Sequence, residues 1–220
     1  ETIPKTDYLA KQPMGRVHFA FSLASHCNLN CKGCAHFSPL SQQEFPDFEE
    51  AERDFARLAQ LFNGKCKSIS LMGGEPLLNP QIEDYCRMVR KYFPVGDVQV
   101  VTNGILLMKM PDSFYQTCKE AKISIHVTPY PIKLDHKAIL KRCRRYGVPY
   151  YFYWGETSKD EFFRYVVDET GSQDMVQNFI DCANANYCLF LYKGRMYPCG
   201  AGAHFRIFNQ YYQAGMELSD

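Results

Sequence analysis

Three cysteines and a histidine lie close together near the start of the sequence. The stretch "ASHCNLNCKGCAHF", residues 24–37, contains Cys27, Cys31, Cys34 and His36. Thiolates are the usual ligands of iron–sulfur clusters, and the spacing Cys-x3-Cys-x2-Cys lets a short loop wrap one face of a compact cluster. The same loop also suits a zinc ion held by the three thiolates and the His36 imidazole in a closed tetrahedral site. Taken alone, the loop leaves both kinds of metal site open.

Two further turns carry polar or glycine residues directly after predicted strands. The turn Gly73-Gly74-Glu75-Pro76 follows one strand, and Thr102-Asn103-Gly104 follows the next. Glycines let backbone amides approach a ligand closely, and a helix N-terminus favours negative groups. The Glu75 carboxylate can accept hydrogen bonds from an ammonium group. The first turn therefore suits a zwitterionic small molecule.

Strand and helix patterns alternate along most of the chain. We expect strands at 16–23, 67–72, 98–102, 123–128 and 150–154, and helices at 47–63, 80–93, 112–121 and 135–147. Consecutive βα units imply a parallel sheet with right-handed crossovers, either open or curled into a partial barrel. Ligands of such sheets collect at the carboxyl ends of the strands, where the cysteine loop and both turns fall.

The expected fold class is α/β, a partial (βα)6-type parallel barrel with a small C-terminal cysteine-bearing extension. The barrel is assigned to residues 16–173, after an irregular N-terminal segment of residues 1–15. The extension, residues 174–220, is predicted to contain a short helix that leads to Cys182 and a hairpin with Lys193-Gly194 at its turn.

The overall composition narrows the class of protein. The chain has 25 basic and 24 acidic side chains, a balance that argues against a nucleic-acid partner. No stretch approaches the roughly 18 apolar residues of a membrane span, and no secretory leader is visible, so we expect a cytoplasmic protein without a membrane partner. Thiols stay reduced in the cytoplasm, so metal binding or burial must account for the ten cysteines.

Several of these residue types are expected to be structural. Four cysteines lie at core-facing helix positions or next to a buried strand and are assigned to packing, namely Cys66, Cys86, Cys118 and Cys143. Three histidines have no partner identifiable from the sequence and are expected to be structural or exposed, namely His18, His136 and His204.

The cysteine loop and the glycine turn together carry a family resemblance. Cys27-x3-Cys31-x2-Cys34 with Gly73-Gly74-Glu75-Pro76 resembles the radical S-adenosylmethionine (radical SAM) superfamily over roughly residues 16–155. The resemblance implies that the three cysteines hold a [4Fe-4S] cluster, whose fourth iron binds the amino and carboxylate groups of S-adenosylmethionine.

The same resemblance suggests further cofactor contacts. Residues 73–76 would hold the amino group of S-adenosylmethionine. Asn103, with Ser124 or His126 on the next strand, would meet its ribose or carboxylate.

The resemblance also implies an activity. The reduced cluster would cleave S-adenosylmethionine to a 5′-deoxyadenosyl radical that abstracts hydrogen from a substrate, with an electron donor such as flavodoxin or ferredoxin as partner. A peptide is slightly favoured as the substrate to be modified, and a carbohydrate or a small metabolite is the alternative. The outcome, whether oxidoreductase, isomerase or transferase, is equally open.

One residue departs from the family pattern. The position before the third cysteine is usually aromatic in the superfamily and is Gly33 here. Packing against the adenine must then come from elsewhere, and His36 or Phe37 is the substitute that we hypothesise. The hypothesis predicts that His36→Ala weakens cofactor binding.

The tail cysteines resemble a second motif. Cys182-x11-Gly194-x4-Cys199 is similar to the start of SPASM or twitch extensions, which carry an auxiliary iron–sulfur cluster, and Cys188 is an extra thiol between them. No cysteine follows Cys199, so we expect that the chain is cut short, that the site is incomplete, or that a substrate or water fills the gap. The alternatives to a second cluster are structural zinc and unmetallated thiols, one of which could donate hydrogen to a substrate radical.

A rival from another class is a non-catalytic module that binds zinc or an iron–sulfur cluster on the same fold and serves in interactions. Its metal site would be closed by His36. The Gly73–Pro76 turn and the Thr102–Gly104 turn would have no purpose in such a module, so the enzyme is the favoured interpretation.

Overall fold

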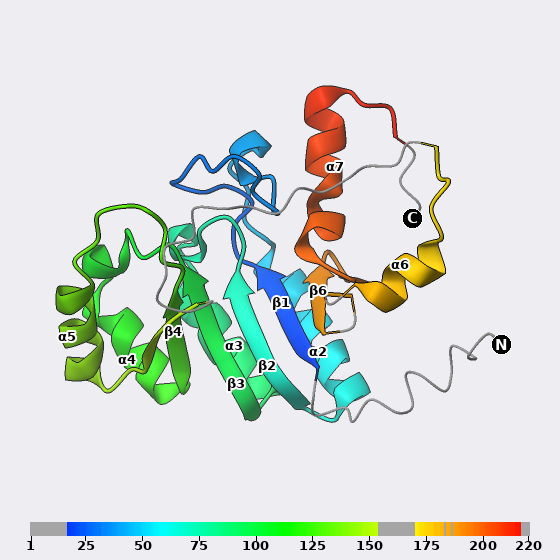
Figure 1. Ribbon diagram of the computed structural model, residues 1–220. Helices are drawn as coiled ribbons and strands as arrows, with labels where there is room; N and C mark the ends of the chain where they lie inside the picture. Colours follow the sequence, from blue (N-terminus) through cyan, green and yellow to red (C-terminus); the bar gives the residue numbers. More distant parts are fainter. Residues whose placement is uncertain (1–16, 154–169, 183, 186, 217–220) are drawn as a thin grey trace.

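A computed structural model describes residues 17–153, 170–182, 184–185 and 187–216. Within these residues a seven-stranded sheet forms the centre of the molecule, with strand order β5-β4-β3-β2-β1-β6-β7 (Figure 1). The strands are β1 His18–Ser22, β2 Lys65–Met72, β3 Val95–Thr102, β4 Ile123–Val127, β5 Tyr150–Phe152, β6 Cys188–Tyr192 and β7 Arg195–Tyr197. All neighbouring pairs are parallel except β6 and β7.

Helices connect the parallel strands and cover one face of the sheet (Figure 1). They are α2 Phe48–Phe62, α3 Ile82–Tyr92, α4 Asp112–Glu120 and α5 His136–Tyr146. Short 3-10 turns lie at Ser38–Leu40 (η2), Pro76–Leu78 (η3) and Leu107–Lys109 (η4). The helices α6 Met175–Asp181 and α7 Gly200–Tyr212 belong to the C-terminal part. The predicted α/β class with consecutive parallel βα units is confirmed.

Local sequence signals set the ends of the helices. Asp47 caps α2 by accepting a hydrogen bond from the Glu50 amide, and Asn63 ends that helix in a left-handed conformation. Asp135 caps α5 in the same way, and Gly147, at φ 69°, ends it. The helix predicted over 47–63 is confirmed, with Asp47 and Asn63 as its two caps.

The two faces of the sheet differ in character. Phe19, Ile69, Val98 and Ile123 are register partners across four strands, and each is at most 1% exposed beneath the helices. One residue further along, the partners are Ala20, Ser70, Gln99 and Ser124, which point to the opposite face because side chains alternate along a strand. The face not covered by α2–α5 is therefore partly polar.

Hydrogen bonds link the polar residues of this second face. The Gln99 amide donates to Ser70 Oγ at 2.6 Å, and Ser70 Oγ lies 3.2 Å from Nε2 of His18. His18 also bonds Ser68 through Nδ1, and burial lowers its pKa to about 4. The imidazole is therefore neutral and structural.

The residues assigned to packing behave as expected. The thiol-bearing side chains of Cys86, Cys118 and Cys143 are fully buried, and Cys66 is 6% exposed. The three unassigned histidines have partners in space: His18 bonds serines, His136 Nδ1 lies 2.8 Å from the Tyr150 hydroxyl, and His204 Nε2 lies 3.1 Å from Ser22 Oγ.

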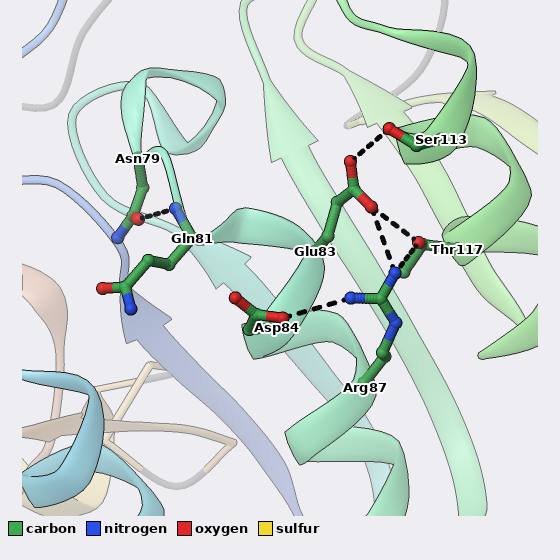
Figure 2. A network of polar contacts seen from close by, with 7 residues as sticks. All are labelled: Asn79, Gln81, Glu83, Asp84, Arg87, Ser113 and Thr117. Carbon is green, nitrogen blue, oxygen red and sulfur yellow. Dashed lines mark hydrogen bonds and ion pairs between the residues drawn. The ribbon is translucent and has the colours of Figure 1, made fainter.

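A polar network holds α3 against α4 (Figure 2). The Glu83 carboxylate accepts hydrogen bonds from Ser113, Thr117 and Arg87, at 2.7, 2.9 and 3.1 Å. The Arg87 guanidinium also donates to Thr117 Oγ1 at 2.6 Å. The network therefore links the two helices that follow β2 and β3.

The C-terminal part contains two features that the sequence did not predict. The expected hairpin is present as β6 and β7, but β6 also pairs in parallel with β1, so the hairpin extends the main sheet. Helix α7 follows, although it begins with glycines, which are poor helix formers. The predicted irregular segment 1–15 and the predicted strand ends at residues 16 and 154 lie outside the described residues.

Candidate functional site

The cysteine loop after β1 is fastened to the glycine turn after β2. The Gly74 amide donates to the Ala24 carbonyl at 2.8 Å, and the Glu75 amide donates to the His26 carbonyl at 3.0 Å. These bonds continue the pairing of β1 with β2 beyond the ends of both strands. They place the loop that carries Cys27 directly beside the turn.

Close backbone packing explains both glycines of the turn. A Cβ at Gly73 would lie 2.6 Å from the Ala24 carbonyl oxygen, and a Cβ at Gly74 would lie 2.0 Å from the His26 carbonyl oxygen. Gly73 also has a φ of 128°, which disfavours other residues. We expected backbone amides of this turn to approach a ligand. The amides of Gly74 and Glu75 instead donate hydrogen bonds to the cysteine loop, so the expectation is wrong for these two residues.

The buried Glu75 carboxylate joins the two turns. It is 0% exposed and accepts hydrogen bonds from the Leu77 amide at 3.1 Å, the Thr102 hydroxyl at 2.6 Å and the Asn103 amide at 2.9 Å. Burial raises the pKa of Glu75 to about 7, although the three donors act in the opposite direction. The carboxylate thus orients the turn after β3 relative to the turn after β2.

Asn103 then connects this assembly to the first cysteine. Its Nδ2 donates to Asn28 Oδ1 at 2.6 Å and lies 3.6 Å from Cys27 Sγ, while its Oδ1 accepts from the Ile105 amide at 3.0 Å. Glu75, Asn103 and Cys27 therefore form a continuous path from the glycine turn to a sulfur atom.

Cys27 shares its surroundings with the other two loop cysteines. Burial raises the pKa of its thiol to about 11, while donation from the Leu29 amide at 3.4 Å and from Asn103 lowers it. The Tyr130 hydroxyl, on the loop after β4, lies within electrostatic range of all three thiols and of Glu75. Sequence reasoning missed Tyr130, although the stretch Thr128-Pro129-Tyr130-Pro131 follows a predicted strand at the same edge.

His36 and Phe37 contact the C-terminal part of the chain. The His36 ring centroid lies 5.1 Å from that of His204 and 5.5 Å from that of Phe190. Phe37 lies 5.6 Å from Phe208 of α7. A Cβ at Gly200 would come within 2.8 Å of His36 Nε2, so the start of α7 packs directly on this imidazole.

Ser124 and His126 line a cavity of about 500 Å³ with residues from the amino-terminal parts of β3 and β4, including Asp97 and Lys122. Ser124 Oγ lies 3.0 Å from His126 Nε2, and burial lowers the pKa of that histidine. The structure thus brings the cysteine loop, the glycine turn and Asn103 together. Ser124 and His126 lie instead in a separate cavity, which is not lined by the loop, the turn or Asn103.

The three C-terminal cysteines have different environments. Cys188 is half-buried on β6 as the register partner of His18, and burial, followed by the nearby Cys199 thiol, raises its pKa to about 11. Cys199 caps α7 through its sulfur, and Cys182 is exposed at the end of α6. An auxiliary cluster at these residues stays a prediction.

The donor set of the cysteine loop suits an iron–sulfur cluster. The thiols of Cys27, Cys31 and Cys34 are partly buried on one loop at the carboxyl edge of the sheet, and thiolates are the usual ligands of such clusters. In the part of the chain that the structure describes, no group of three or more His, Cys, Asp or Glu side chains is arranged to hold one metal ion. Two buried polar atoms lack a hydrogen-bond partner among the described residues, His26 Nδ1 in the loop and Ser38 Oγ at the start of η2.

A comparison with protein families decides the classification. The sequence profile of the radical SAM superfamily matches residues 21–147, more than half of the chain. The chain belongs to the radical SAM superfamily. Membership implies a [4Fe-4S] cluster and S-adenosylmethionine as cofactors, and the expected family is confirmed.

Curated relatives are similar to part of this chain. A GTP 3′,8-cyclase of Aquifex aeolicus (strain VF5) is 29% identical over 113 residues, which are 48% of this chain and 33% of the relative. A GTP 3′,8-cyclase of Rhodopirellula baltica is 32% identical over 144 residues, 61% of this chain and 37% of the relative. The chain thus spans about a third of the length of these relatives.

Solved structures show the same fold. BtrN in complex with AdoMet and 2-DOIA has a TM-score of 0.58 and 18% identity, covering 89% of this chain and 80% of BtrN. The anSMEcpe structure with bound AdoMet has a TM-score of 0.50 and 21% identity, covering 62% of this chain and 43% of that protein. Among the described residues of this radical SAM chain, no helix has the length and apolarity needed to cross a membrane.

Proposed function

We propose that this protein is a radical SAM enzyme in which Cys27, Cys31 and Cys34 hold the [4Fe-4S] cluster. When bound, the cluster and S-adenosylmethionine supply a 5′-deoxyadenosyl radical that takes a hydrogen atom from the substrate. The observation that carries the proposal is the attachment of the three-cysteine loop to the Gly73–Pro76 turn by two backbone hydrogen bonds. A metal site closed by protein ligands has no need of this attachment.

Each residue of the assembly has a distinct task in this proposal. The three thiolates leave one iron of the cluster without a protein ligand, as a catalytic site requires. His36 is an unsuitable fourth ligand because its ring lies against His204 and the start of α7. Glu75 holds the turn in place through three hydrogen bonds. The Glu75 and Pro76 carbonyls already accept the Leu78 and Asn79 amides, at 3.2 and 3.1 Å, so within residues 73–76 the carbonyls of Gly73 and Gly74 are the proposed acceptors for the cofactor's ammonium group.

The substrate is proposed to be a small polar metabolite, with a nucleotide or a carbohydrate as members of that class. The named relatives are GTP 3′,8-cyclases. The sheet face opposite α2–α5 also carries neutral polar side chains, among them the buried Ser70 and Gln99, which bond each other. The alternative of a peptide substrate depended on the SPASM or twitch resemblance of the tail, for which neither the geometry nor the comparisons add support.

The remaining assignments follow from the same proposal. A flavodoxin or ferredoxin would deliver the electron, and the protein would act in the cytoplasm. Residues 16–173 would form the catalytic barrel and residues 174–220 the extension, whose β6 completes the sheet beside β1.

A product assay tests the proposal. Anaerobically reconstituted protein is supplied with dithionite and S-adenosylmethionine, and 5′-deoxyadenosine is quantified by mass spectrometry. We expect product from the wild type and from Cys66→Ala, a buried cysteine outside the loop, and none from the Cys27/Cys31/Cys34 triple alanine variant. Tightly bound zinc without 5′-deoxyadenosine in the wild type would instead support the non-catalytic module.

A further inference from the structure

Asn103 bonds Glu75 of the glycine turn through its backbone amide and contacts the Cys27 thiol through its side chain. We propose that Asn103 is a positioning residue that donates a hydrogen bond to the Cys27 thiolate in the cluster-loaded protein and thereby raises the reduction potential of the cluster. The proposal rests on the proposed function in one respect, the assignment of Cys27 as a cluster ligand.

The orientation of the Asn103 side chain is determined from two sides. Its backbone amide donates to Glu75 Oε2 at 2.9 Å, and its Oδ1 accepts from the Ile105 amide at 3.0 Å. With the oxygen fixed in this way, the Nδ2 end faces the cysteine loop, where it lies 3.6 Å from Cys27 Sγ and 2.6 Å from Asn28 Oδ1. The residue is only 4% exposed, so water does not compete freely for the amide.

The effect on the cluster follows from charge. Reduction adds one negative charge to the cluster, part of which resides on the thiolate sulfurs. A hydrogen bond to a charged sulfur is stronger than one to a neutral group, so a donor stabilises the reduced state more than the oxidised state. The Leu29 amide, 3.4 Å from the same sulfur, is a second donor, so loss of Asn103 removes part of this stabilisation.

Asn79 provides a matched control. It is 2% exposed, its Oδ1 accepts from the Gln81 amide at 2.8 Å (Figure 2), and its Nδ2 donates to the Leu23 carbonyl at 2.8 Å. Asn79 therefore has the same turn geometry as Asn103 and supports the start of the same loop. Both of these side-chain hydrogen bonds are to backbone atoms, so the loss of Asn79 perturbs the loop while leaving the Asn103–Cys27 hydrogen bond in place.

The test is the midpoint potential of the cluster, measured by redox titration followed by electron paramagnetic resonance. Reconstituted wild-type protein, Asn103→Ala and Asn79→Ala are compared at equal iron content. We expect a more negative midpoint for Asn103→Ala and a wild-type midpoint for Asn79→Ala. An unchanged midpoint for Asn103→Ala, or an equal shift for Asn79→Ala, overturns the proposal.

A second variant keeps the test decisive if Asn103→Ala does not fold. Asn28 is exposed, and Asn28→Ala removes the acceptor that shares the Asn103 amide with Cys27. The amide is then free to approach the sulfur, so the midpoint should become less negative, and a more negative midpoint refutes the proposal. If the variants show these shifts but the cluster-loaded wild type releases no 5′-deoxyadenosine, the proposed function alone is refuted.

Discussion

Gly74 lies so close to His26 that the second glycine of the turn and the cysteine loop form one packed unit. The close approach is between backbone atoms, so no change of side-chain rotamer can make room for a Cβ at residue 74. The Gly74 amide also donates a hydrogen bond to the Ala24 carbonyl. The position of the loop that carries the three thiols therefore depends on the absence of a side chain at residue 74.

We expect Gly74→Ala to detach the loop from the turn. The added methyl group must displace backbone, so the free energy of unfolding should fall by about 3 kcal/mol or more, and anaerobic reconstitution should leave less iron bound. Thermal unfolding and iron analysis measure the two effects. Gly202→Ala is the control: it lies in α7, and its Cβ would meet only the Cys199 sulfur, at 3.9 Å. Equal iron in both variants contradicts this account.

The buried Glu75 predicts a pH dependence of stability in the apo protein. Its pKa is about 7 when folded and 4.5 without the fold, so between these pH values the folded chain holds a proton that the unfolded chain releases. The contribution of Glu75 to the free energy of unfolding is therefore at its maximum below pH 4.5. This contribution decreases as the pH rises through 7, by up to about 3 kcal/mol.

Urea unfolding at pH 5 and pH 8 measures this loss. Glu75→Gln cannot titrate, and comparison with it removes the contribution of other groups. The wild type should lose more stability than the variant between the two pH values, and parallel losses would show that Glu75 is ionised throughout.

The sequence was sufficient to predict most of the sheet and the gathering of the site. Alternating strand and helix patterns, the caps at Asp47 and Asp135, and the buried positions of Cys86 and Cys118 are local or periodic properties of the chain. Because parallel strands end at one edge, the loops after β1, β2 and β3 were expected to meet there, and their hydrogen bonds show that they do.

The remaining features depend on contacts between distant residues. The packing of His36 on α7, the close approach of Gly74 to the His26 carbonyl and the position of Tyr130 near the thiols have no local sequence signal. Helix α7 was missed because its glycine-containing start has low intrinsic helix propensity and is offset by capping and tertiary packing.

His36→Ala separates two roles for that histidine. Its contacts with His204 and Gly200 predict that the variant loosens α7, with amide hydrogen exchange in residues 200–212 faster by about tenfold, which corresponds to about 1.4 kcal/mol. His136→Ala, in α5, is the control and should leave α7 protection unchanged. The hypothesis that His36 packs against the adenine predicts weaker S-adenosylmethionine binding, which calorimetry measures on the same variant. Unchanged exchange with weaker binding would favour the adenine role alone.

The central claim is that three thiolates of the cysteine loop hold a cluster with one iron open to S-adenosylmethionine. The most direct test is electron–nuclear double resonance on the reduced cluster in the presence of S-adenosylmethionine labelled with 15N in its amino group and 17O in its carboxylate. We expect hyperfine coupling from both labels in the wild type, because the cofactor binds an iron atom directly. A fully reconstituted cluster without coupling from either label would contradict it.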